Sequence, residues 1–158
     1  MDDEVTVYAS QFTSLLRRLG RTVEGLSEAE LNWRPPAPDA NSAYVIAAHT
    51  QGAVRGWVLG IACGQPVERD RPAEFAATGA DAADLIASGE RLADEIDAAL
   101  GALTAADLDR RVLPDQSYWG LTEPHEITVR QALENVADHA ATHVGRVELT
   151  RDLALQRG

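Results

Sequence analysis

The 158-residue sequence contains no lysine, and all 14 of its basic residues are arginines. The absence of lysine excludes a Schiff-base nucleophile and the lysine of a phosphate-binding loop. The Gly-x-Ser-x-Gly elbow of α/β-hydrolases and the Gly-x-Gly-x-x-Gly fingerprint of dinucleotide-binding folds are also missing. The four histidines, His49, His125, His139 and His143, are therefore the richest chemical signal in the chain.

Cysteine and long apolar runs are scarce as well. The single cysteine, Cys63, excludes an intrachain disulfide, and it falls near the end of a helical pattern, where the helix dipole disfavours a thiolate ligand. No run of about 18 apolar residues is present, so we expect no membrane partner. Residues 1–4 are acidic where a secretory signal would be basic, so we expect a cytoplasmic location.

The charge balance argues against a nucleic-acid partner. The chain has 25 acidic and 14 basic residues, which gives a net charge of −11. A surface of this average sign repels a phosphate backbone. At this length the chain can bury a core without disulfides, so we expect one domain that spans residues 1–158.

Apolar residues recur at helical spacing in four segments, and no segment shows the alternation of a strand. Ser42 is expected to cap the second helix and Asp81 the third, while Thr128 and Gln131 form a capping box for the fourth. Gly20 is expected to end the first helix. The pattern predicts an all-α, four-helix bundle. We expect its helices over residues 5–19, 42–61, 81–103 and 128–153.

Three irregular segments separate the predicted helices. Residues 21–41 are rich in proline, but the capping-box pattern at residues 27–30 predicts one short helical turn. Residues 65–80 are expected to be a plain connection. Residues 104–127 are too long for a tight turn, and we expect them to form a pocket wall or lid.

The histidines suggest a metal site. His139 and His143 lie four residues apart on the last predicted helix, so they share one face and can bind one transition-metal ion. His49 falls in the middle of the most apolar helix, where an unpaired imidazole carries a desolvation penalty, and we expect it to be the third ligand. His125 is a poor alternative, because the helix places His139 roughly 16 Å beyond its start. The competing interpretation, three structural histidines hydrogen-bonded to their neighbours, stays open.

Further residues extend the pattern of the histidines: Trp33-Arg34-Pro35, then Ser42 opening a helix with His49 seven residues on, and finally His139-x-x-x-His143-x-Gly145. In these features the sequence resembles the DinB-like metalloprotein superfamily, whose members include mycothiol- and bacillithiol-dependent transferases. The similarity covers nearly the whole chain in helix order and spacing.

The resemblance implies an up-down-down-up bundle with long connections between the second and third and between the third and fourth helices. The sixteen residues 65–80 can supply the first connection, because a 30 Å crossover needs roughly nine extended residues. The resemblance also implies a metal ion, nickel or zinc, held by His49, His139 and His143. Homodimers are frequent in the family, so the resemblance implies a homodimer here.

The sequence departs from the family pattern at Val144, where arginine is common, and at Arg146, where glutamine is often found. Arg146 is expected either to repel the metal or to hold an anionic ligand, and the alternative is a rim arginine paired with an acidic residue. With Arg55, Tyr118 and Trp119 it is a candidate for the lining of a substrate pocket, and the alternative for each is surface or core packing.

Two hypotheses for function follow. Three neutral imidazoles leave the ion's charge uncompensated and coordination positions open, which is typical of a catalytic site. The first hypothesis is a metal-dependent S-transferase that uses a low-molecular-weight thiol on a small electrophile, with a metal-dependent hydrolase as its close variant. The second is a non-catalytic, dimerising bundle that binds a metal or ligand. The sequence singles out no general acid or base.

Overall fold

The computed structural model describes residues 3–157, and its main elements are four long helices. They are α1 (Asp3–Val23), α3 (Ala43–Val54), α5 (Ala83–Leu100) and α7 (Val129–Leu155), and α3 continues as a π-helix over Arg55–Ala62. The short elements are α2 (Glu28–Asn32), α4 (Arg71–Ala76), α6 (Ala105–Leu108), a 3₁₀ turn (Gln116–Tyr118) and the strands β1 (Arg111–Val112) and β2 (Ile127–Thr128). The predicted all-α fold is confirmed.

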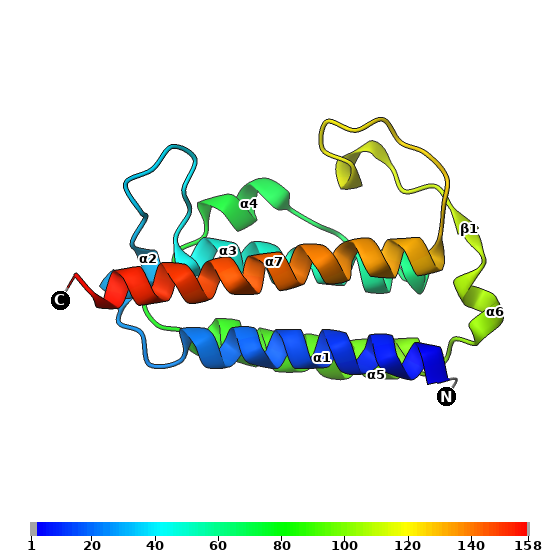
Figure 1. Cartoon of the computed structure of the whole chain (residues 1–158), viewed down its shortest axis with the longest axis horizontal. Coiled ribbons are helices and arrows are strands. Elements are labelled where there is room, and N and C mark those ends of the chain that lie inside the picture. Colours follow the sequence, from blue (N-terminus) through cyan, green and yellow to red (C-terminus); the bar gives the residue numbers. More distant parts are fainter. Residues whose placement is uncertain (1–2, 158) are drawn as a thin grey trace.

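The long helices form two layers, with α3 and α7 side by side in one and α1 and α5 in the other (Figure 1). Ion pairs join α1 to α7 at both ends: Arg130 contacts Glu4 at 2.7 Å, and Arg18 contacts Glu148 at 2.6 Å. Low residue numbers of α1 thus meet low residue numbers of α7. The two helices therefore run in the same direction.

Helices α3 and α5 are also parallel to each other. Gln51 donates a hydrogen bond to the Leu85 carbonyl at 2.7 Å, and Arg55 pairs with Glu95 at 2.9 Å. The chain must therefore return along the bundle between α3 and α5. Residues 65–80 make this return, and they cross the outer face of the α3/α7 layer (Figure 1).

Several predicted caps are present. Ser42 accepts a hydrogen bond from the backbone N–H of Val45 at 3.1 Å, and Thr128 with Gln131 forms the predicted capping box at the start of α7. The turn predicted within residues 27–30 is α2, which also begins with a capping box. These starts were predictable because each cap depends on residues within one turn.

Three predicted boundaries are wrong. One is the end of the third helix, because α5 ends at Leu100 and not at residue 103. Gly20 does not end α1, which continues to Val23 because Val23 is fully buried against the rest of the core. The left-handed backbone of Gly25, with φ of 77°, follows the helix end. Asp81 lies one residue before the N-cap of α5, although its carboxylate accepts the N–H of Ala83 at 2.8 Å.

Two irregular segments contain more structure than expected. Residues 65–80 carry α4, which Asp70 caps by accepting the N–H of Ala73 at 3.0 Å. Residues 104–127 contain α6 and β1, and β1 pairs with β2 in an antiparallel, two-residue ladder. The strands are too short for an alternating sequence pattern to reveal them.

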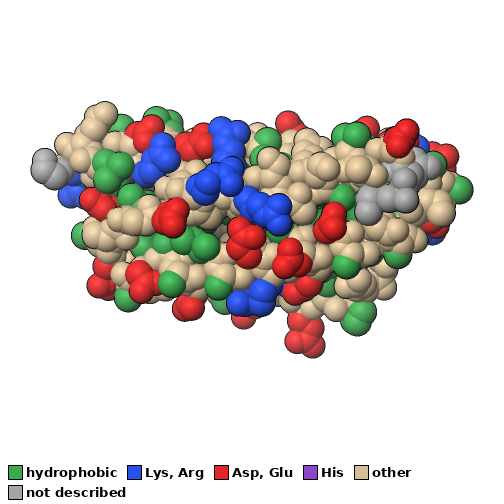
Figure 2. All heavy atoms as spheres, turned by 90° about the horizontal axis from the view of Figure 1, so that it is seen from below, with side chains coloured by type: hydrophobic (Ala, Val, Ile, Leu, Met, Phe, Trp, Pro, Cys, Tyr) green, Lys and Arg blue, Asp and Glu red, His purple; other side chains and the backbone are tan. Residues whose placement is uncertain are grey.

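The core lies between the two layers and is almost entirely aliphatic. Among residues 3–157, no helix is both long and apolar enough to cross a bilayer. The outer face of the α1/α5 layer mixes acidic, arginine and apolar side chains, and no histidine is visible on it (Figure 2). The largest fully buried side chains include Phe12, Leu19, Leu31, Leu59, Leu92, Ile96, Leu100, Leu108 and Leu133.

Candidate metal centre

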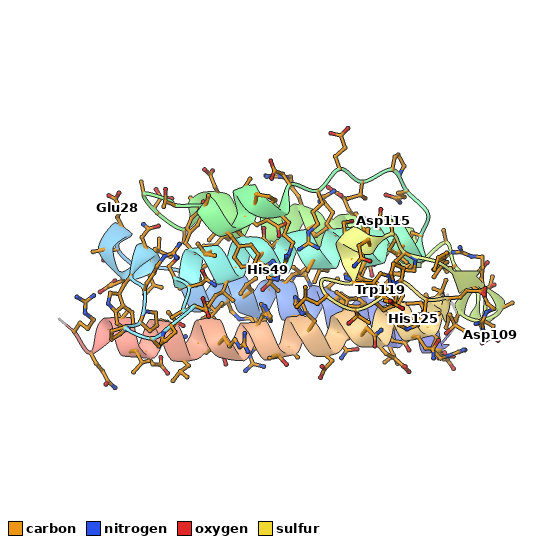
Figure 3. All side chains as sticks on the ribbon, turned by 90° about the horizontal axis from the view of Figure 1, so that it is seen from above. Glu28, His49, Asp109, Asp115, Trp119 and His125 are labelled. Atoms are coloured by element: carbon orange, nitrogen blue, oxygen red, sulfur yellow. The ribbon has the colours of Figure 1, made fainter. Side chains whose placement is uncertain are left out.

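Helices α3 and α7 bring three of the four histidines together. His49 comes from the middle of α3, and His139 and His143 come from successive turns of α7. One nitrogen of each ring lies within 4.8 Å of the others, and the Nε2 atoms of His49 and His139 are 3.3 Å apart. Figure 3 shows His49 on the side of α3 that faces α7. The three histidines therefore converge, as the sequence predicted.

A carboxylate from α4 holds the His49 ring. Oε1 of Glu74 lies 3.1 Å from Nδ1 of His49, and Arg69 contacts both Glu74 oxygens at 2.9 Å. Burial raises the pKa of Glu74, but the hydrogen bonds from His49 and Arg69 outweigh it and leave that pKa below its ordinary value. An ionised carboxylate can only accept, so Nδ1 of His49 donates. The lone pair of His49 is then on Nε2, which faces the other two rings.

A glycine in α3 makes room for this carboxylate. A Cβ atom at position 52 would lie 2.6 Å from Cδ of Glu74 and closer still to one carboxylate oxygen. Gly56, one turn further along, makes similar room, because a Cβ there would lie 3.0 Å from the Tyr118 ring and 3.6 Å from Arg69. These two glycines let α4 and the Tyr118 segment approach the backbone of the π-extended helix.

The imidazoles of His139 and His143 are neutral at pH 7. Burial, followed by the charges of neighbouring groups, lowers the pKa of both His139 and His143 from 6.5 to about 4. Nδ1 of His143 is buried and has no hydrogen-bond partner among the described residues. Neutral rings with available lone pairs are what a transition metal requires.

The donor set therefore fits a divalent metal ion. Two nitrogens bound to one zinc ion at about 2.0–2.1 Å are roughly 3 to 4 Å apart. The three ligand atoms lie within 4.8 Å of one another, so a small rotation of the rings brings them to this spacing. The carboxylate behind His49 matches the usual support of a metal-binding histidine.

Two pockets meet at the histidines. The larger has a volume of about 510 Å³ and is lined by Arg146, Arg71 and Phe75. The smaller has a volume of about 260 Å³, and its walls include Tyr118 and Trp119. His49 and His139 line both pockets. The histidine cluster is thus accessible to small molecules from two sides.

Three of the four residues predicted to line a substrate pocket do line one of these two pockets. Arg146 lines the larger pocket, and Tyr118 and Trp119 line the smaller one, so residues 104–127 do supply a pocket wall. Arg55 does not join them: it pairs with Glu95 and lines a groove between α3 and α5. Six residues of α-helix rotate a side chain by about 240°, which carries Arg55 away from the face of His49.

The other two chemically active residues lie outside the cluster. His125 is exposed in the segment before α7, where its ring packs on Trp119 with centroids 4.2 Å apart. Cys63 is partly buried against the core, and burial raises the pKa of its thiol to about 11. Both positions agree with their predicted exclusion from the metal site.

Sequence reasoning missed Glu74, Arg69 and Arg71, all of which lie in the segment between α3 and α5. The signal for α4 was present, since Asp70 followed by Pro72 is a typical helix start. Recognising α4 would still not have revealed which face it covers. The contact between Glu74 and His49 joins residues 25 positions apart, and no local pattern encodes it.

Comparisons with known proteins bear on this arrangement of helices and histidines. No curated protein matches the chain. The family model for the DinB superfamily matches residues 11–147, a span that contains all three clustered histidines. The chain therefore belongs to the DinB superfamily.

Proposed function

We propose that this protein is a metal-dependent enzyme that joins a low-molecular-weight thiol to a small electrophile, with His49, His139 and His143 as the metal ligands. One observation carries the proposal: an open three-histidine donor set lies where two separate pockets meet. A structural metal site is normally closed by four protein ligands, whereas a two-substrate reaction needs access from more than one direction.

The chain's own groups prepare the site. Zinc or nickel bound to the three histidines would supply Lewis acidity that lowers the pKa of a thiol or water at the open positions. His139 and His143 are neutral at pH 7 because of their lowered pKa values, so they do not need to lose protons before they bind. Glu74 fixes the orientation of His49, and Arg69 in turn fixes Glu74.

The two pockets can hold the thiol and its acceptor on different sides of the histidines. In the reaction a bond forms between the thiol sulfur and the electrophilic carbon, and the thiol proton leaves. Where the acceptor has a leaving group, that group departs with the bonding electron pair. Where it has none, the displaced electron pair moves to a neighbouring atom of the acceptor, which takes up a proton. Burial raises the pKa of Tyr118, whose phenol therefore stays protonated at neutral pH and can donate a hydrogen bond into the smaller pocket.

The test begins with protein purified without chelator. We expect stoichiometric zinc or nickel by elemental analysis, and metal-dependent consumption of mycothiol, bacillithiol or glutathione when 1-chloro-2,4-dinitrobenzene is added. His143→Ala should abolish both metal binding and thiol consumption. His125→Ala is the matched control for metal binding, because this histidine lies outside the cluster, and it should retain the metal.

Other results would favour the competing hypotheses. Stoichiometric metal that requires His143, without turnover of any thiol, would support a non-catalytic metal-binding bundle. Ester hydrolysis that needs the metal but no thiol would support the hydrolase. Absence of metal binding, both on purification and on addition of zinc or nickel, would show that the histidines are structural.

A further inference from the structure

We propose that the larger pocket binds the carboxylate of a small organic acid through Arg71 and Arg146. The inference rests on the proposed function in treating this pocket as a substrate site beside the metal ligands, and it names the chemical class of that substrate. It predicts that an acid binds there in preference to its uncharged amide.

The first support is the lack of carboxylate partners for these two arginines. The chain carries a net charge of −11, so acidic partners are plentiful. Seven of the 14 arginines form an ion pair with another described residue, and among them Arg17, Arg18 and Arg55 pair with residues of other helices. Among residues 3–157, neither Arg71 nor Arg146 forms an ion pair, although both line the same pocket.

The second support is the way the two arginines are placed. Arg71 comes from α4 and Arg146 from α7, one turn beyond His143, so two separate elements direct positive charge at the cluster. The guanidinium of Arg71 lies over the Phe75 ring, 5.1 Å from its centroid. Stacking of this kind uses the face of the guanidinium and leaves its N–H groups free to donate.

The third support is the charge balance of the pocket. Its acidic lining is limited, within the described part of the chain, to Asp39. Arg69 is neutralised by Glu74 behind His49, so it adds no net charge. Arg71 and Arg146 therefore leave one excess positive charge before a divalent ion is added, and three afterwards. Such a field selects an anion in a protein that otherwise repels one.

The remaining walls indicate what the anion is attached to. Ile46, Phe75 and Leu149 are apolar, and the pocket has room, at about 510 Å³, for a ring or a short chain beside the charged group. A guanidinium matches the planar geometry of a carboxylate and can bind both its oxygens. A carboxylic acid with a compact apolar body satisfies both parts of the lining.

The experiment compares phenylacetate with phenylacetamide, which has the same shape without the charge. Each is titrated by NMR into chelator-treated protein and into protein loaded with zinc. The metal-free titration matters because a carboxylate can coordinate zinc directly. We expect metal-free protein to bind phenylacetate about tenfold more tightly than phenylacetamide, the preference typical of one or two charge-assisted hydrogen bonds at an exposed site.

Variants then test whether Arg71 and Arg146 cause the preference for phenylacetate over phenylacetamide. Arg71→Gln and Arg146→Gln should each reduce it, and the double variant should abolish it in metal-free protein. Both side chains are exposed, so the variants should fold normally, and circular dichroism checks this. Arg55→Gln is the matched control, because Arg55 lines a different groove, and it should leave the preference unchanged.

Three results would overturn the inference: equal binding of the two probes, an undiminished preference in the double variant, or no detectable binding of phenylacetate at its highest soluble concentration. The titrations do not depend on turnover. An arginine-dependent preference in a protein that consumes no thiol would leave the pocket assignment standing and refute the proposed function. Thiol consumption without any preference for the acid would support the proposed function and refute the assignment of the pocket to a carboxylate.

Discussion

Replacing Gly52 with alanine should separate metal affinity from stability. The new methyl group would lie 2.6 Å from Cδ of Glu74, far inside van der Waals contact. The backbone of α3 cannot move away without disturbing the buried helix, whereas the Glu74 carboxylate is the free end of a flexible side chain. The carboxylate should therefore leave, and His49 loses its partner while all three metal ligands remain.

The magnitudes come from two opposing effects. Loss of a carboxylate behind a metal-binding histidine typically lowers metal affinity about 10- to 100-fold, or about 1.4 to 2.7 kcal/mol. Stability behaves differently, because alanine is favoured over glycine inside a helix by about 1 kcal/mol. That gain offsets part of the lost hydrogen bonding of Glu74. We expect the free energy of unfolding of Gly52→Ala to stay within about 1 kcal/mol of the wild type.

The assay is competition for zinc with a chromophoric chelator, together with thermal unfolding of the metal-free protein. Gly145→Ala is the matched control: Gly145 is also inside a helix, two residues after His143, but a Cβ there meets no atom within 4 Å. It should gain stability and keep its zinc affinity. Equal zinc affinity in the two variants would refute the role assigned to Glu74.

Two further predictions concern stability. Because the pKa values of His139 and His143 are lowered to about 4, the unfolded chain takes up protons before the folded protein does, so metal-free protein should lose stability as the pH falls from about 6.5 to 4. Urea unfolding at a series of pH values measures this, and a His139→Gln, His143→Gln double variant that shows the same dependence would contradict it. Leu133→Ala, at a fully buried position, should cost about 2 to 5 kcal/mol in urea unfolding. Leu121→Ala, at a fully exposed side chain, should cost less than about 0.5 kcal/mol. Similar losses of stability in the Leu133 and Leu121 variants would show that Leu133 is not part of the core.

Much of the fold could be predicted because its signals are local. The caps at Ser42 and Thr128 depend on side chains that reach a backbone N–H three residues away. The end of α1 was predicted wrongly because Gly20 is a local signal that tertiary burial of Val23 overrides. Local rules therefore located the helices but misjudged a boundary where packing continued beyond the expected stop.

The candidate site was only partly predictable. His139 and His143 share a face because of helix geometry alone, and His49 could be added because a buried imidazole needs a partner. Arg55 was a candidate for the pocket lining, but the turn of the helix directs it to Glu95, in a groove between α3 and α5. Its position in the sequence did not determine which groove the side chain would enter.

The sequence by itself determined the all-α bundle, its four main helices and the pair of histidines on α7, because periodicity, caps and four-residue spacing act within a few turns of chain. Only the tertiary structure decided that α4 lies over α3, where Glu74 reaches His49 and Arg71 faces the same pocket as Arg146. Those relations depend on how a separate helix docks on the bundle. The absence of a side chain at Gly52 matters because α4 places the Glu74 carboxylate against this position.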